Sequence, residues 1–145
     1  MIAIDTNILL RYLLWDDKPQ AVKADSLING AEPVLVTDVV LVETLWTLKG
    51  KKYRLDRPAL VDVLDALFEE PNIHFEDNQT VWQSLGDYCQ AKSVKVGNKK
   101  KEADFADALI VNKARFHATE KHHTLHAVYT FDRAAQNIPG TAIPS

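Results

Sequence analysis

Four acidic residues stand where a soluble domain usually places apolar or neutral side chains. Each one ends an apolar run or interrupts an apolar helix: Asp5 in MIAID, Glu43 in VVLVETLW, Asp107 in DFADALIV and Asp132 in AVYTFD. Carboxylates packed close together repel one another and resist ionisation. A divalent cation relieves this repulsion, because hard cations bind carboxylate oxygens. The pattern therefore indicates a metal-dependent hydrolase.

Alternating strands and helices must position these acids. We expect strands at 1–5, 33–37, 72–76, 127–131 and 141–144, and helices at 7–15, 17–30, 38–50, 57–69, 79–92 and 102–117, with a loop at 93–101 and a short helix after 132. Asp17 with Pro19, and Asp38, are the expected helix N-terminal signals. Strands separated by helices predict an α/β fold with a mainly parallel sheet covered on both faces.

This topology gives the acids a common location. Ligands of open α/β sheets bind beyond the carboxyl ends of the strands. Asp5 and Asp132 lie at such ends, while Glu43 and Asp107 lie on helices that can flank the same edge. We therefore expect a site assembled by folding and not by one local loop.

Each acid also has a structural alternative. Asp5 and Asp132 can cap the helices that follow them, because aspartate is a favoured N-cap residue. Glu43 can be held by a basic partner such as Arg11 or Arg54.

Asp104 and Asp107 are three residues apart and share a helix face, where like charges destabilise a helix. The structural alternative makes Asp104 a first-turn acid favoured by the helix dipole.

Length, composition and charge define the class of protein. The 145 residues suit one domain with a sizeable core, and 46% hydrophobic with 26% charged residues is ordinary for a globular chain. A single cysteine, no apolar stretch of about 18 residues and a strand at the N-terminus predict a cytoplasmic protein without a membrane span or signal peptide.

The net charge of −3 argues only weakly against nucleic acid. It arises from 17 basic and 20 acidic residues, and setting aside four metal-binding acids leaves 16 against 17. The run KVGNKKK at 95–101 then forms a basic patch.

IDTNILL, VETLW, DFADALI and TFDR together resemble the acidic motifs of PIN-domain ribonucleases, most closely those of VapC-type bacterial toxins. The resemblance covers the whole chain, in order and with ordinary spacing, as a single domain of residues 1–145. It implies a three-layer α/β/α fold, cleavage of RNA, and Mg²⁺ or Mn²⁺ held by Asp5, Glu43, Asp107 and Asp132.

The chemistry expected at this site is in-line attack of water on a phosphodiester. We expect Asp5 and Asp107 closest to the metal, with Glu43 and Asp132 completing the pocket and Asp104 further out.

Other side chains are expected to support this site. Thr6, Asn7 and Thr130 have a role either in orienting a ligand or water, or as turn and cap residues. The expected RNA contacts are Arg11, Lys99, Lys100, Lys101 and Arg133, although a charge run such as the three lysines is also typical of a solvated loop.

The resemblance also implies partners. Toxins of this kind pair with a small antitoxin, often form homodimers, and reach DNA only through the antitoxin. Two other classes stay open: a Mg²⁺-binding phosphoacceptor signalling domain, and a catalytically silent binding module. The first would require two adjacent acids near the first strand and a lysine after a late one, but here Asp5 is followed by Thr6, and TFDR has no lysine.

Overall fold

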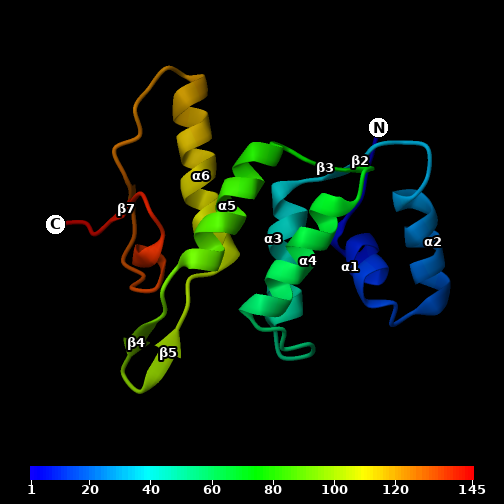
Figure 1. Ribbon diagram of the computed structural model, residues 1–145, viewed down its shortest axis with the longest axis horizontal. Helices are drawn as coiled ribbons and strands as arrows, with labels where there is room; N and C mark the ends of the chain where they lie inside the picture. Colours follow the sequence, from blue (N-terminus) through cyan, green and yellow to red (C-terminus); the bar gives the residue numbers. More distant parts are fainter. The chain divides into compact units, whose positions relative to one another are not determined.

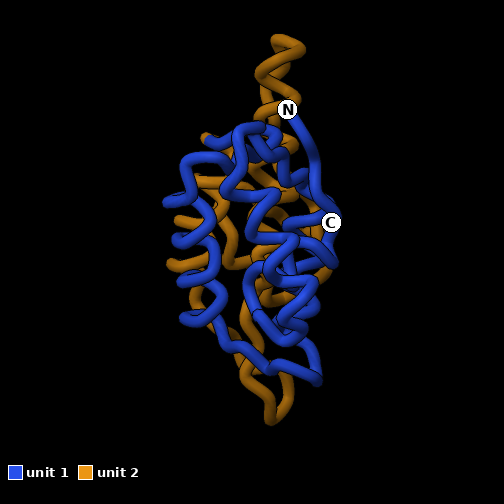
Figure 2. Tube along the Cα trace, turned by 90° about the vertical axis from the view of Figure 1, so that its right-hand side faces the viewer, with its two compact units in different colours: residues 1–78 blue, residues 79–145 orange.

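The computed structural model describes all 145 residues, and these divide into two compact units (Figure 2). Unit 1 comprises residues 1–78 and unit 2 comprises residues 79–145. No helix in the chain combines the length and the apolar character that crossing a bilayer requires.

Unit 1 contains a parallel sheet and four helices (Figure 1). Its elements are β1 Ile2–Ala3, α1 Thr6–Leu14, α2 Lys18–Ile28, β2 Val34–Val36, α3 Asp38–Lys49, α4 Arg57–Glu69 and β3 Ile73–Phe75. The strands lie in the order β1-β2-β3, and Val34 pairs with both Ile2 and Ile73 in parallel register. The predicted parallel arrangement of these strands is confirmed.

The core of unit 1 draws on every helix. Each helix contributes at least one aliphatic side chain with no exposed surface: Leu9 from α1, Ile28 from α2, Leu41 from α3 and Leu64 from α4. Burial of a side chain of this size contributes about 1.5–3 kcal/mol. In this core α1 packs against both α2 and α3, and α3 also contacts α4.

Helix starts in unit 1 follow the sequence signals with one exception. Asp17 caps α2 by accepting from the Gln20 amide at 3.1 Å, as predicted. The prediction that Asp38 caps α3 is wrong by one residue, because Thr37 is the cap and Asp38 is the first helical residue. The Asp38 amide donates to Glu76 Oε2 at 2.7 Å.

Unit 2 is built on two helices. Its elements are α5 Asn78–Gln90 (which begins at the last residue of unit 1), β4 Val94–Val96, β5 Lys99–Lys101, α6 Phe105–Glu120, β6 Val128–Tyr129, the 3₁₀ turn η1 Ala135–Asn137 and β7 Thr141–Ala142. The Tyr88 ring of α5 meets the Phe105 ring of α6 edge-on at 6.0 Å. Asn112 Nδ2 donates to Asp87 Oδ2 at 2.9 Å. Aromatic packing and a hydrogen bond thus join α5 to α6.

The short strands of unit 2 differ from the prediction. β6 covers only two of the five expected residues and pairs in parallel with β7. The loop predicted at 93–101 is wrong, because β4 and β5 form an antiparallel hairpin with Lys95 opposite Lys100. Gly97 adopts a φ of +64° at the first turn position, where a two-residue hairpin favours glycine.

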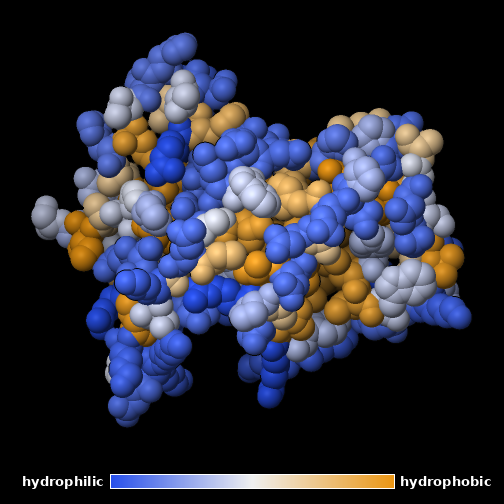
Figure 3. Space-filling model, viewed as in Figure 1, coloured by the Kyte–Doolittle hydropathy of each residue, from blue (hydrophilic) through white to orange (hydrophobic).

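Some large apolar side chains are exposed on each unit, and Figure 3 shows orange patches among the hydrophilic side chains of one face. On α3, Val39 is 66% exposed and Trp46 is 54% exposed. These two residues are seven apart, so they share a helix face with Glu43, which lies between them. The carboxylate of Glu43 is therefore flanked by exposed apolar surface.

Candidate metal and nucleic-acid site

Asp5 lies two residues beyond β1 and is exposed to solvent. Its Oδ1 accepts a hydrogen bond from the Ile8 amide at 3.0 Å, so Asp5 is the N-cap of α1. The structural alternative for this residue is confirmed. It leaves Oδ2 with no hydrogen-bond partner, and a carboxylate oxygen fixed at a helix start remains available to a ligand.

Glu43 is exposed on α3 and is held by Thr6, not by a basic residue. The Thr6 hydroxyl donates to Glu43 Oε2 at 3.2 Å. The structural alternative of a basic partner such as Arg11 or Arg54 is wrong, because Arg54 Nε donates to the Lys51 carbonyl and Arg11 contacts other side chains. Because Thr6 follows Asp5 directly, the two acids of unit 1 are linked through one hydroxyl.

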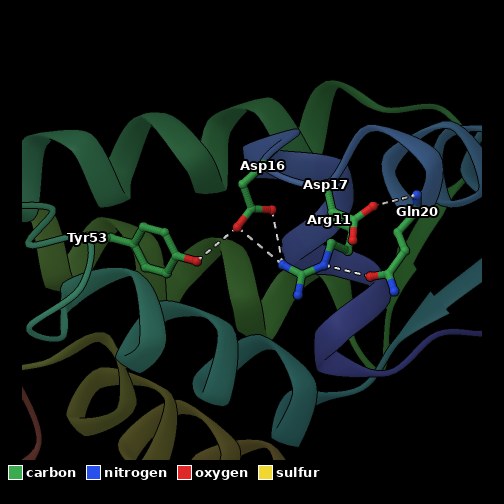
Figure 4. Close-up of polar contacts among 5 residues, drawn as sticks. All are labelled: Arg11, Asp16, Asp17, Gln20 and Tyr53. Atoms are coloured by element: carbon green, nitrogen blue, oxygen red, sulfur yellow. Dashed lines mark hydrogen bonds and ion pairs between the residues drawn. The ribbon is translucent and has the colours of Figure 1, made fainter.

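Arg11, near the end of α1, is held by two polar side chains, Gln20 and Asp16 (Figure 4). Its Nε donates to Gln20 Oε1 at 2.8 Å, and its Nη1 donates to both oxygens of Asp16 at 3.0 and 3.3 Å. The Tyr53 hydroxyl donates to Asp16 Oδ2 at 3.2 Å. Nη2 takes no part in these bonds.

These contacts shift the pKa of the Asp16 carboxyl. Partial burial raises its pKa, but the Arg11 guanidinium and the Tyr53 hydroxyl, together with other hydrogen bonds, lower it more. The pKa of Asp16 therefore lies below its ordinary value of 3.8, and the ionised form that orients Arg11 is favoured in the fold.

A pocket of about 470 Å³ opens on α1 and α2 beside these groups. We call it the α1/α2 pocket, and it is lined by Asp5, Asn7, Ile8, Arg11, Gln20 and Lys23. One cavity is thus lined by a predicted metal ligand (Asp5), a predicted RNA contact (Arg11) and an exposed lysine (Lys23). Sequence reasoning missed Gln20 and Lys23, although their spacing of three residues on α2 indicates a shared face.

Asp104 and Asp107 form the start of α6 in unit 2. Asp104 is the N-cap, and its amide donates to Asp107 Oδ2 at 2.8 Å, as in a capping box. The Asp107 amide donates to the Asp104 carbonyl at 3.0 Å. Backbone hydrogen bonds thus offset the repulsion expected between these two acids.

Asp132 lies three residues beyond β6 and is exposed. Its Oδ1 accepts from the amides of Ala134 and Ala135 at 2.9 and 3.1 Å, so it caps the turn that leads into η1. Its own amide donates to Thr130 Oγ1 at 3.0 Å. The cap alternative for Asp132 and the turn role of Thr130 are confirmed, while Asp132 Oδ2 accepts no hydrogen bond.

Basic side chains of unit 2 are solvent-exposed. Lys99, Lys100 and Lys101 are all exposed on β5, and Arg133 is exposed directly after Asp132. Lys95 and Lys100 are cross-strand partners, and like charges in that position destabilise a hairpin. The hairpin therefore carries a local positive charge, and RNA contact by these lysines stays a prediction.

Each unit supplies part of the predicted acid set: Asp5 and Glu43 in unit 1, and Asp104, Asp107 and Asp132 in unit 2. Neither unit by itself gathers three or more His, Cys, Asp or Glu side chains into a group that fits a metal ion. The meeting of all four acids stays a prediction.

Two comparisons with known proteins bear on this site. A comparison with curated proteins gives no match. The family profile of the PIN domain, a nuclease-type fold, matches residues 2–140 and so spans both units. The six α-helices and the parallel sheet agree with the three-layer α/β/α architecture predicted for such a chain. The chain belongs to the PIN-domain family.

Proposed function

We propose that this protein is a metal-dependent endoribonuclease whose acids Asp5, Glu43, Asp107 and Asp132 hold Mg²⁺ or Mn²⁺. PIN domains are usually nucleases, which supports a hydrolase at the coarse level. The observation that carries the proposal is the link from Asp5 through Thr6 to Glu43, with the hydroxyl-to-carboxylate bond of 3.2 Å. This link brings two exposed acids together beyond a parallel strand, where α/β folds bind ligands.

The donor chemistry of these residues fits a hard cation. Asp5 Oδ2 and Glu43 Oε1 accept no hydrogen bond within the protein, and both side chains are exposed. Magnesium keeps several waters and needs only one or two direct carboxylates. When bound, such an ion lowers the pKa of water and screens the phosphate charge. Asp107 and Asp132 are proposed to complete the set from unit 2.

Hydrogen bonds within the chain orient the proposed metal ligands before the substrate binds. The capping bond from the Ile8 amide fixes the Asp5 carboxylate, so no side-chain ordering is required when RNA arrives. Thr6 orients Glu43 in the same way. Arg11, Arg133 and the lysines of the β4–β5 hairpin supply positive charge for the RNA backbone, which attracts cations regardless of sequence.

We also propose that the protein is the toxin of a toxin–antitoxin pair and forms a homodimer. Exposed Val39 and Trp46 on both sides of Glu43 support a protein partner near the acids, because exposed apolar groups mark contact surfaces. Induced expression should stop growth, and co-expression of an antitoxin should restore it. Normal growth of cells that contain soluble protein would refute the toxin role and leave the nuclease proposal standing.

The nuclease proposal is tested with labelled single-stranded RNA. Wild-type protein should cleave it with Mn²⁺ or Mg²⁺ and stop with EDTA. Attack by water gives linear phosphate ends, whereas attack by the RNA's own 2′-hydroxyl gives a 2′,3′-cyclic phosphate. Cyclic ends, or cleavage that EDTA leaves unchanged, would contradict the proposal.

Assays of RNA cleavage and of phosphate uptake distinguish the nuclease from the two alternative functions. A phosphoacceptor domain would take up phosphate from an acyl-phosphate donor at one aspartate and leave RNA intact. A silent binding module would bind RNA or protein without either reaction. Cleavage that depends on Asp5 excludes both.

A further inference from the structure

The lining of the α1/α2 pocket combines two basic side chains with Asp5, whose Oδ2 accepts no hydrogen bond. Lys23 is exposed on α2 and forms no ion pair or hydrogen bond within the protein. Arg11 reaches the same cavity from α1. Two positive side chains therefore face one space at the edge of the proposed metal site.

Arg11 is held as a rigid part of the pocket wall. Gln20 binds Nε at 2.8 Å, and Asp16 binds Nη1 at 3.0 Å, so the plane of the guanidinium is set from two sides (Figure 4). Nη2 makes no bond in this arrangement, and a planar guanidinium presents its free N–H groups in a fixed direction. Asp16 offsets part of the Arg11 charge, and the N–H groups of Nη2 remain as hydrogen-bond donors for an anion.

Nearby acids offset one of the pocket's two cations and leave the other unpaired: Asp16 forms an ion pair with Arg11 at 3.0 Å, whereas Lys23 has no such partner. Asp16 is committed to Arg11 and Tyr53, and Asp17 accepts from the Gln20 amide at the start of α2. Neither residue lines the pocket. Asp5 is the single acid of the lining, against the two basic side chains Arg11 and Lys23.

We propose that the α1/α2 pocket is a subsite for one backbone phosphate of the RNA strand, next to the phosphate that is cleaved at Asp5. Lys23 binds that phosphate as a mobile charge, Arg11 Nη2 binds it as a fixed donor, and Gln20 keeps Arg11 in place. The position relative to the cleaved bond rests on the proposed function, while the binding of a strand in the pocket does not.

The experiment uses the full chain and a 5′-labelled single-stranded oligoribonucleotide, with anisotropy measured in EDTA so that the strand stays intact. Lys23→Gln is compared with Lys18→Gln, which removes the same charge from an exposed position of α2 outside the pocket. Both variants change the net charge equally. The subsite predicts that Lys23→Gln alone weakens binding roughly threefold and flattens the salt slope by about 0.7.

A second experiment tests whether the pocket binds the phosphate of an RNA strand or free inorganic phosphate. Inorganic phosphate is titrated into the wild type and both variants by calorimetry. Loss of phosphate binding in Lys23→Gln with unchanged strand binding would overturn the assignment to RNA. Equal strand affinities of Lys23→Gln and Lys18→Gln, or no strand binding by the wild type, would overturn the subsite. Failure of the wild type to cleave RNA with Mn²⁺ would refute only the nuclease and the position beside the cleaved bond.

Discussion

The Thr6 hydroxyl donates a hydrogen bond to Glu43 Oε2 at 3.2 Å, although the two residues are 37 positions apart in the chain. Thr6 is the first residue of α1 and Glu43 lies within α3, so this bond joins the two helices that carry the acids of unit 1. Because Asp5 caps the same helix start, one local structure sets the positions of both carboxylates.

Loss of the Thr6 hydroxyl should therefore reduce cleavage more than stability. Thr6→Val removes the donor at nearly constant volume, and partners that orient metal ligands are typically worth about 10- to 100-fold in metal affinity or activity. A single hydrogen bond contributes only about 0.5–1.5 kcal/mol to folding. Thr6→Ser keeps the hydroxyl and should retain most activity. Equal cleavage rates for the valine and serine variants would show that this bond has no part in the reaction.

The pH dependence of stability should report on Asp16. Its pKa in the fold is lower than in the unfolded chain, so its contribution is fully present above about pH 4 and disappears as the pH falls through the folded value. Asp16→Asn should be less stable than wild type at pH 7, and the difference should be smaller at pH 3. Urea unfolding at both pH values measures this, with Asp62→Asn on the exposed face of α4 as control. A difference that persists unchanged at low pH contradicts the role of the Asp16 charge.

The like-charge pair of the β4–β5 hairpin predicts opposite effects on stability and on binding. Lys100→Glu places a carboxylate opposite Lys95, which should stabilise the hairpin by about 0.2–1 kcal/mol. The same change should weaken RNA binding and flatten its salt dependence, because a phosphate contact is lost. Melting temperature and anisotropy are compared with those of Lys100→Gln, which removes the charge without reversing it. Unchanged binding by both variants would mean that the hairpin is only solvated.

Substitutions of Asp5 and Asp107 should have different effects on the free energy of unfolding. Asparagine caps helices as well as aspartate, so Asp5→Asn should leave the free energy of unfolding almost unchanged in EDTA. Asp107→Ala removes the acceptor for the Asp104 amide and should cost about 0.5–1.5 kcal/mol. Thermal unfolding in EDTA measures both. A large loss of stability in Asp5→Asn would contradict the cap assignment.

The sequence predicted well those parts of the fold that depend on local patterns. Apolar runs located β1, β2 and β3, and Asp17 with Pro19 located the start of α2. The β4–β5 hairpin was missed because its exposed lysines have no apolar alternation, although Gly97 and Asn98 are a turn signal.

The site was predictable as a set of residue types but not as contacts. The resemblance indicated the acids, but the sequence offered only arginines as an alternative partner for Glu43, because charge complementarity was the visible signal. The partner is a neutral hydroxyl that only folding brings near. The Asp16–Arg11–Gln20 contacts were missed for a related reason: they depend on the packing of α1 against α2, which periodicity alone does not specify.

The most direct test of the nuclease account compares RNA cleavage by Asp5→Asn and Asp62→Asn at the same Mn²⁺ concentration. Both changes remove one exposed carboxylate charge, and only the first removes a proposed metal ligand. With both variants folded by circular dichroism, the account predicts wild-type rates for Asp62→Asn and a loss of about 100-fold or more for Asp5→Asn. Equal cleavage by the two variants would contradict the account, because Asp5 would then be a helix cap and nothing more.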